Sequence, residues 1–272
     1  DKHNYSRENG WAIGAIVSYS QATGDSEALA TAEQAARWII ENRSLPGGGF
    51  RDDAVDNAGP YLDDTLAMGS AFLSIYAATA ERDWLKRAGE AAQFIRQNFA
   101  ETNGAASVPV FITARVPEGS VLPSVRKDEE NIRLVRFANL AGRYLGSQDL
   151  ASMAETAMKY LNTEAIALQY ITNAGILLAD AELRSDPLHI TVVGKKDDPA
   201  ARALYDGAWR FPQGYKRTEW WDRREGDLPN PDVRYPELPK AAAFICTNKR
   251  CSLPIFVPED IPKTIAKFKA QK

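Results

Sequence analysis

The stretch ATGDSEALATAEQAARWII, residues 22–40, is the first of three related segments. The second is ATAERDWLKRAGEAAQFI (78–95) and the third is LGSQDLASMAETAMKYL (145–161). Aligning them superposes two alanines and one bulky aromatic residue. The superposed sets are Ala32, Ala88 and Ala154; Ala35, Ala91 and Ala157; and Trp38, Phe94 and Tyr160. Small residues at helical spacing let two helices approach closely, and the aromatic fills the gap beyond, so each copy predicts a packed helix.

Another helix-like run precedes each copy. The three runs are WAIGAIVSYSQ (11–21), LAMGSAFLSIYAA (66–78) and IRLVRFANLAGRYL (132–145). The repeating unit is therefore helix, short turn, helix, with a period of roughly 50–70 residues that indicates stacked hairpins. One more helix is expected from EAIALQYITNAGILLADAEL (164–183). We predict a mainly α fold over residues 1–184, built from antiparallel helical hairpins of a complete or partial α/α toroid.

The composition of the chain changes after residue 185, where most of the prolines lie. LHITVVG (188–194) reads as a buried strand, and KRTEWWD (216–222) and AAAFICTN (241–248) as further strands. Between them, DDPAARALYDGAWRF (197–211) predicts a helix with Asp198 as N-cap and Pro199 in its first turn. We expect a small α/β unit over residues 185–272, packed on the helices or standing as a second domain.

Bulk properties exclude some classes of function. The net charge of −3 gives no electrostatic support for a nucleic-acid partner. No apolar run approaches the ~20 residues that span a bilayer, so we predict no membrane span and a soluble protein, cytoplasmic or exported. The chain begins with Asp1 and carries no signal peptide, so we interpret it as a mature form or as an excised piece of something longer.

The candidate chemistry lies in GPYLDDTLAMG (59–69), where Asp63 and Asp64 separate a Gly-Pro turn from an apolar run. An aspartate in that place is a good helix N-cap, which is the simplest interpretation. The alternative is a polar cleft at the funnel of a toroid, where a carboxylate pair acts as acid and base. We expect one of the two acids to cap the helix and the other to face the funnel.

Other residues near these acids support the cleft. Three more acids lie just upstream, and aromatic side chains that stack on sugar rings accompany them. The upstream acids are Asp52, Asp53 and Asp56. The candidate ligand-binding residues are Tyr61, Asp64, Trp11 and Phe50, and the candidate catalytic residues are Asp63 and Asp64.

The two cysteines, Cys246 and Cys251, have the spacing C-x4-C, which is not the C-x-x-C of a redox centre. We interpret them as structural cysteines that flank a turn, with a local disulfide as the alternative in an oxidising compartment. A zinc site needs about four ligands, and only the distant His3 and His189 are available to supplement the cysteines. We therefore predict neither a metal nor a cofactor.

Three segments together resemble one family. They are GPYLDDTLAMGSAFLSIYAATAERDWLKRA (59–88), ITVVGKKDDPAARAL (190–204) and AAAFICTNKRCSLPIFVPEDI (241–261). In order and spacing they are similar to the thioredoxin-domain-containing, spermatogenesis-associated type of protein, the DUF255 or YyaL-like family. The resemblance implies a thioredoxin-like domain followed by a six-hairpin α/α toroid similar to those of sugar epimerases and glycosidases. This chain resembles the C-terminal part, because it has no thioredoxin domain and too few helices for six hairpins.

Two departures from the family bear on function. Its Trp-Asn-Gly appears here only as Glu8-Asn9-Gly10-Trp11, and the paired histidines of epimerases are absent. The resemblance implies a thioredoxin-like domain, its own or separate, as partner, and a carbohydrate or other small molecule as ligand. Uncovered apolar helix faces add a homo-oligomer as a further expectation. The leading interpretation is a ligand-binding or scaffolding region of a thioredoxin-linked protein, and the alternative is a sugar-active hydrolase or epimerase.

Overall fold

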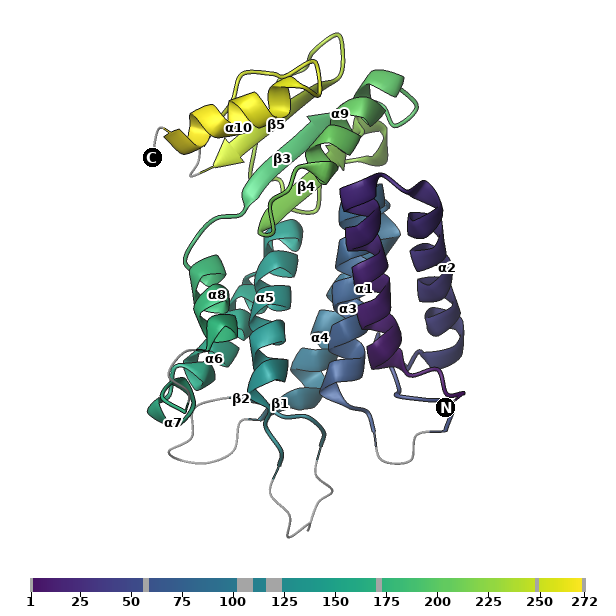
Figure 1. Cartoon of the computed structure of the whole chain (residues 1–272), viewed down its shortest axis with the longest axis vertical. Coiled ribbons are helices and arrows are strands. Elements are labelled where there is room, and N and C mark those ends of the chain that lie inside the picture. Colours follow the sequence, from purple (N-terminus) through teal and green to yellow (C-terminus); the bar gives the residue numbers. More distant parts are fainter. Residues whose placement is uncertain are drawn as a thin grey trace.

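The computed structural model describes residues 2–55, 59–101, 110–115, 124–169, 173–247 and 250–270. Its first part consists of three antiparallel helical hairpins, as predicted (Figure 1). The hairpin helices are α1 (Ser6–Thr23) with α2 (Ser26–Arg43), α3 (Leu62–Thr79) with α4 (Arg82–Phe99), and α5 (Asp128–Leu145) with α6 (Gln148–Leu161). A short antiparallel pair, β1 (Ala100–Glu101) and β2 (Val110–Phe111), lies between the second and third hairpins.

The three hairpins share one kind of tight turn. Gly24, Ala80 and Gly146 end the first helix of each pair in the left-handed region, with φ of 81°, 56° and 62°. The next residue then starts the second helix, and its side chain caps that helix in two of the three cases, at Asp25 and Ser147. A left-handed residue satisfies the last carbonyls of a helix and reverses the chain. The sequence repeat therefore corresponds to a repeated turn as well as to repeated helices.

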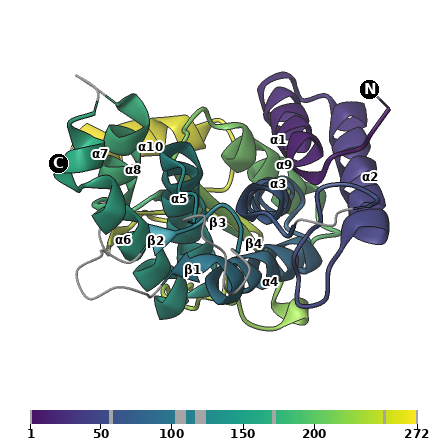
Figure 2. The same ribbon diagram turned by 90° about the horizontal axis from the view of Figure 1, so that it is seen from below.

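The hairpins stand side by side in an arc, as Figure 2 shows from below. Helices α1, α3 and α5 run parallel to one another and form the inner row, while α2, α4 and α6 form the outer row. The repeated alanines Ala32, Ala88 and Ala154 are fully buried, as expected for helix contacts. Trp38 differs from its counterpart Phe94 because it is 39% exposed. Its helix α2 ends the outer row, and in the described part of the chain no other hairpin packs beyond it.

The helix predicted over residues 164–183 is instead two helices, α7 (Glu164–Ala167) and α8 (Ala174–Leu183). Asn173 starts α8, because its side-chain oxygen accepts the backbone N–H groups of Gly175 and Ile176 at 3.1 and 3.3 Å. An asparagine that bonds to the following backbone favours a new helix start over a continuous helix.

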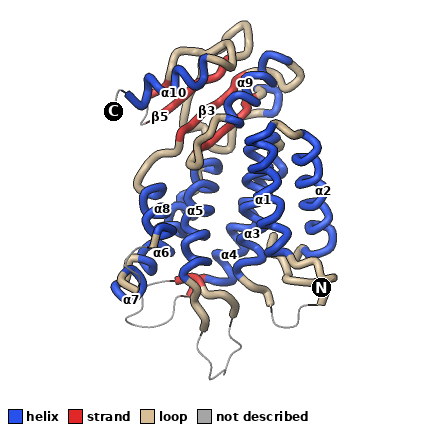
Figure 3. Tube along the Cα trace, in the orientation of Figure 1, coloured by secondary structure: helices blue, strands red, loops and turns tan. Residues whose placement is uncertain are grey.

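The C-terminal part is a four-stranded sheet with two helices, drawn in red and blue in Figure 3. The strand order is β4-β3-β5-β6, with β3 parallel to β4 and antiparallel to β5. The predicted strands and the predicted helix over 197–211 are confirmed. The elements are β3 (Leu188–Val193), α9 (Pro199–Arg210), β4 (Lys216–Trp221), the 3₁₀ turn η1 (Arg223–Glu225), β5 (Ala242–Thr247), β6 (Arg250–Cys251) and α10 (Asp260–Ala270).

The sheet closes one end of the helical unit (Figure 1). Tyr144 of α5 accepts the backbone N–H of Thr218 in β4 at 2.8 Å, and Tyr205 of α9 donates to the carbonyl of Ala77 in α3 at 2.9 Å. One continuous set of buried apolar residues runs from the helices into the sheet. The N-terminal ends of α1, α3 and α5 therefore lie together at the opposite, open end. In the described residues, none of the helices has the length and apolar character needed to cross a membrane.

Candidate functional site

The two candidate acids lie in the first turn of α3, and neither of them is its N-cap. The helix begins at Leu62, and the N-cap is Tyr61, whose side chain makes no capping bond. The expectation that Asp63 or Asp64 caps the helix is therefore wrong. The physical reason is pairing with a distant segment: Leu62 donates its N–H to the carbonyl of Thr113 at 2.8 Å, and Tyr61 forms a backbone bridge with Ala114.

Asp63 is directed toward the third hairpin. It is buried, and Arg133 of α5 donates Nη2–H to its Oδ2 at 2.7 Å. Its other oxygen, Oδ1, has no hydrogen-bond partner within the described part of the chain. Asp63 is therefore an ion-paired carboxylate with one acceptor oxygen left over.

Asp64 is directed toward the start of the chain. Only 2% of it is exposed, and its carboxyl group shares a hydrogen bond with the carboxyl group of Asp52 and accepts the backbone N–H of Arg7. Burial, followed by the charge and the hydrogen bond of Asp52, raises the pKa of Asp64 to about 8. One proton is thus held between the two carboxyl groups at neutral pH. The adjacent aspartates therefore have different partners, Arg133 for Asp63 and Asp52 with Arg7 for Asp64.

The other predicted acids do not join this pair. Asp53 contacts His3 and accepts Nη2–H of Arg43 at 3.2 Å, and its hydrogen bonds with the backbone of Ala54 and with His3 lower its pKa. These contacts tie the N-terminal segment to the end of α2. Asp56 lies outside the described residues.

The predicted aromatic residues have different surroundings. Trp11 of α1 is 45% exposed, and the guanidinium groups of Arg7 and Arg133 lie 5.2 and 5.3 Å from its ring centroid. Phe50 is buried in the core against Phe72, with ring centroids 5.6 Å apart, so a ligand does not reach it. Tyr61 is half-buried at the entrance to α3. Of the predicted aromatic contacts, Trp11 is the one with a large exposed surface beside the acids.

A groove of about 600 Å³ runs along the inner row, and we call it the inner groove. Trp11 and Arg133 line it toward the N-terminal ends of α1, α3 and α5, and residues of the α/β unit, including Lys216, line it at the sheet. Asp63 and Asp64 are not part of the lining. They connect to it through Arg133, which binds Asp63, and through Arg7, which binds Asp64 and lies beside Trp11.

Glycine at position 10 brings these groups together. A Cβ atom on Gly10 would lie 2.6 Å from the carbonyl carbon of Ala67, closer than any side chain tolerates. Helix α1 therefore crosses α3 at contact distance, one turn along from Asp63 and Asp64. This close crossing places Arg7 and Trp11 against the start of α3.

Lys216 lines the inner groove at the sheet end. Its ammonium group is buried and donates to the carbonyls of Ala208, Trp209 and Phe211 at 3.2, 2.5 and 2.7 Å, which are at the C-terminal end of α9. Burial lowers the pKa of Lys216 to about 8. A cation at a helix C-terminus is favoured by the helix dipole, so we assign Lys216 a structural role.

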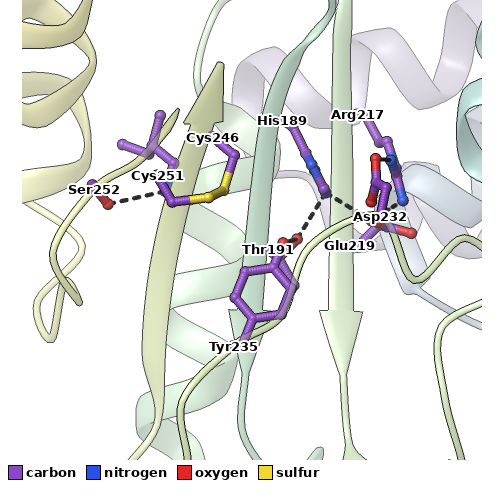
Figure 4. The surroundings of a disulfide bond; sticks show 10 residues. His189, Thr191, Arg217, Glu219, Asp232, Tyr235, Cys246, Cys251 and Ser252 are labelled. Atoms are coloured by element: carbon purple, nitrogen blue, oxygen red, sulfur yellow. Dashed lines mark hydrogen bonds and ion pairs between the residues drawn. A yellow bond between two sulfur atoms is a disulfide. The ribbon is translucent and has the colours of Figure 1, made fainter. Parts of the chain in front are cut away.

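The cysteines form a disulfide bond that joins β5 to β6 (Figure 4). Cys246 and Cys251 are directly opposite each other in the ladder of the two strands. The structure thus shows the alternative of a local disulfide. In the ranges that the structure describes, no three His, Cys, Asp or Glu side chains come together as a metal site.

Sequence reasoning did not single out Arg7 and Arg133, which give the two aspartates their different environments. Arg133 is 70 residues from Asp63 along the chain. The one available signal was the repeat itself, because it places the first turns of α1, α3 and α5 at the same end of the hairpins.

Comparison with known proteins supports the fold. No family model matches the chain, and no curated protein matches it. Among solved structures, a sugar epimerase from a ruminal bacterium matches 59% of this chain at 20% identity, with a TM-score of 0.50. A family 76 glycoside hydrolase (mannosidase) from Bacteroides thetaiotaomicron matches 58% at 16% identity, with a TM-score of 0.47. The cellobiose 2-epimerase from Spirochaeta thermophila matches 58% at 14% identity, with a TM-score of 0.45.

The likeness to the sugar epimerase supports an α/α-toroid-like fold for the helical unit. With the small α/β unit that follows it, the chain has the mainly helical fold class that was predicted. The chain spans 45%, 44% and 43% of the lengths of the three matched structures. It therefore corresponds to less than half of each of them.

Proposed function

We propose that this chain is part of a sugar-active α/α-toroid enzyme, a hydrolase or an epimerase, in which Asp64 and Asp52 supply a proton and Asp63 acts as the ionised carboxylate. The observation that carries the proposal is the contrast between two adjacent acids. Burial and Asp52 raise the pKa of Asp64 to about 8, whereas Asp63 is ion-paired with Arg133. Acid–base chemistry at a glycosidic or anomeric centre needs one protonated and one ionised carboxyl group.

The surroundings suit a carbohydrate. Trp11 offers an exposed ring, and Arg133 lines the inner groove while holding Asp63. Aromatic rings bind the apolar faces of sugars, and guanidinium groups bind their oxygens. The name of the matched sugar epimerase suggests the substrate class.

A scaffolding or purely ligand-binding role is the second candidate, and the burial of both acids favours it. Asp63 is 5% exposed and Asp64 is 2% exposed, and their contacts hold α1, α3 and α5 together at one end. In this interpretation the same hydrogen bonds only stabilise the helix ends. The resemblance to thioredoxin-linked proteins extends the proposal to a partner, a thioredoxin-like domain of the same or another chain.

The proposal also includes a partner that covers the two ends of the arc of hairpins. Exposed apolar side chains lie at both ends of the arc, with Tyr19 on α1 and with Leu177 and Leu178 on α8. A further set of helices, from a longer chain or from a second copy, would remove this surface from water.

The test compares wild type with Asp64→Asn and Asp63→Asn. Each protein is incubated with a panel of mono- and oligosaccharides, and binding is measured by calorimetry and turnover by product chromatography. We expect Asp64→Asn to retain binding and lose turnover, because the amide keeps the shape of the protonated acid and donates no proton. If wild type neither binds nor converts any sugar and both variants only alter stability, the sugar-active role is refuted and the scaffolding role is favoured.

A further inference from the structure

The disulfide lies at the edge of the sheet, with one sulfur accessible and the other covered. Cys246 is 5% exposed, whereas Cys251 is exposed. Strand β6 is the outermost strand in the sheet order β4-β3-β5-β6. Access decides which sulfur of a disulfide a thiolate attacks, so an incoming thiol meets Cys251 first.

The disulfide adds little stability to the β5–β6 hairpin, because backbone hydrogen bonds already pair the two strands. The two cysteines are five residues apart in sequence and sit opposite each other in one hairpin. Next to them, Ser252 donates its N–H to the carbonyl of Ile245 at 2.8 Å, and Ile245 donates its N–H to Ser252 Oγ at 3.1 Å. A disulfide stabilises a protein chiefly by restricting the unfolded chain, and the effect is smallest for short loops. We therefore expect the two strands to stay paired when the bond is open.

A polar cavity of about 570 Å³ adjoins the bond and is lined by both cysteines, His189, Arg217 and Asp232. His189 is the direct ladder partner of Cys246 in β3, and such pairs place their Cβ atoms about 4.5–5.5 Å apart on the same face. Figure 4 shows His189 between the disulfide and the pair Arg217 and Glu219. A sulfur that leaves as an anion at Cys246 would thus be next to an imidazole.

The imidazole is held in place by a chain of contacts. His189 Nε2 lies 2.8 Å from Glu219 Oε2 and 2.9 Å from Thr191 Oγ1. Arg217 binds the same Glu219 at 2.8 Å, and Tyr235 donates its hydroxyl to Thr191 at 2.7 Å. Such a network is unusual on a sheet face that is otherwise apolar, and neither the sugar-active nor the scaffolding role uses it.

We propose that Cys246–Cys251 is a reducible disulfide that exchanges with a protein dithiol, with Cys251 as the attacked sulfur and Cys246 as the leaving group beside His189. The thiolate of the reductant forms a bond with Cys251 Sγ, the Cys246–Cys251 bond breaks, and its electron pair goes to Cys246 Sγ. His189 or water supplies the proton to Cys246. The second thiol of the reductant then attacks the mixed disulfide and releases Cys251 as a thiolate, which takes up a proton. The reductant loses two electrons, and this chain gains two thiols.

The first test is trapping. The oxidised protein is incubated with a thioredoxin whose second active-site cysteine is serine, so that the mixed disulfide persists, and the adduct is located by peptide mass spectrometry. We expect the adduct on Cys251. Attachment to Cys246, or no adduct while the protein stays folded by circular dichroism, would overturn the proposal and leave an inert structural disulfide.

The second test concerns His189. We expect His189→Gln to slow reduction by wild-type thioredoxin about tenfold or more, and to slow alkylation of Cys246 by iodoacetamide in the reduced protein. Tyr235→Phe is the matched control, because it removes a hydroxyl from the same hydrogen-bond chain that contacts Thr191 and leaves the imidazole in place. If both variants lower the rates equally, the network acts only on stability, and the role of His189 is refuted.

Discussion

Replacing Asp64 by asparagine tests the shared proton at the start of α3. The asparagine amide has the shape of the protonated carboxyl group and is also neutral, and its N–H can donate to Asp52 as the carboxyl O–H does. We therefore expect Asp64→Asn to fold normally. Relative to wild type it should become more stable as the pH rises, because it carries no proton to lose.

The magnitude follows from the pKa of Asp64. In the folded protein it is about 8, and in an unfolded chain an aspartate has a pKa of about 3.9. Between these values the folded state binds one proton more than the unfolded state, so the free energy of unfolding falls by about 1.4 kcal/mol per pH unit. The contribution is fully present below about pH 3.9 and is lost as the pH rises through about 8. From about pH 5 to about pH 7 wild type should lose roughly 2–3 kcal/mol that the variant keeps.

The assay is thermal unfolding of both proteins at about pH 5, 6 and 7, a range in which Lys216, with a pKa of about 8, stays largely charged. For a chain of this size the difference corresponds to a relative change in Tm of roughly 5–10 °C. Asp53→Asn is the control, because its lowered pKa keeps it ionised across this range in both states. The change in its Tm with pH should match that of wild type.

Parallel Tm curves for wild type and Asp64→Asn from about pH 5 to about pH 7 would refute the shared proton. The acid role of Asp64 in the proposed sugar chemistry would then fail as well. A steeper fall in wild type that is also abolished by Asp52→Asn would show that the proton belongs to the pair.

Three further changes test other parts of the fold. Gly10→Ala should destabilise the protein by about 1–3 kcal/mol in chemical denaturation, because the new Cβ would meet Ala67. Gly14→Ala on the same helix has open space around it and should stabilise the protein by about 0.5–1 kcal/mol. Equal effects of the two substitutions would contradict the close crossing of α1 and α3. Lys216→Met should cost about 2–4 kcal/mol, because the carbonyls of Ala208, Trp209 and Phe211 at the C-terminal end of α9 lose the lysine as a donor. An unchanged Tm would contradict the structural role of Lys216. Arg133→Met should cost about 1–2 kcal/mol at neutral pH, since it leaves Asp63 buried and unpaired while Arg133 itself is partly exposed, and a stabilised variant would show that the ion pair is dispensable.

The hairpins and the strands could be predicted because their signals are local. Ala32, Ala88 and Ala154 repeat at helix contacts, and Asp198 before Pro199 marks the start of α9. Such patterns depend on a few neighbouring residues and on the period of one element. The single helix expected over 164–183 was wrong for a local reason too, since Asn173 offers its side chain to the backbone and starts a second helix.

The candidate site could be predicted only in part, because its chemistry comes from contacts between distant segments. The sequence places Asp63 and Asp64 at the start of a helix. Their partners, Arg133 and Asp52 with Arg7, become known only when three helices are placed side by side. The local capping rule failed for the same reason, since the backbone bridge of Tyr61 with Ala114 fixed where α3 begins.

The aromatic residues show why composition alone does not identify a binding surface. Phe50 donates its backbone N–H to Thr65, next to the acids, and Trp11 lies beside Arg133, which binds Asp63. Yet Phe50 packs into the core and Trp11 stays 45% exposed. The difference arises because Trp11 projects from the inner row at the close crossing of α1 and α3, next to a groove that no described element fills. Its exposed ring lies beside Arg133, and both side chains line this groove. For that reason Trp11, more than Phe50 or Tyr61, is the aromatic contact to which a ligand search should be directed.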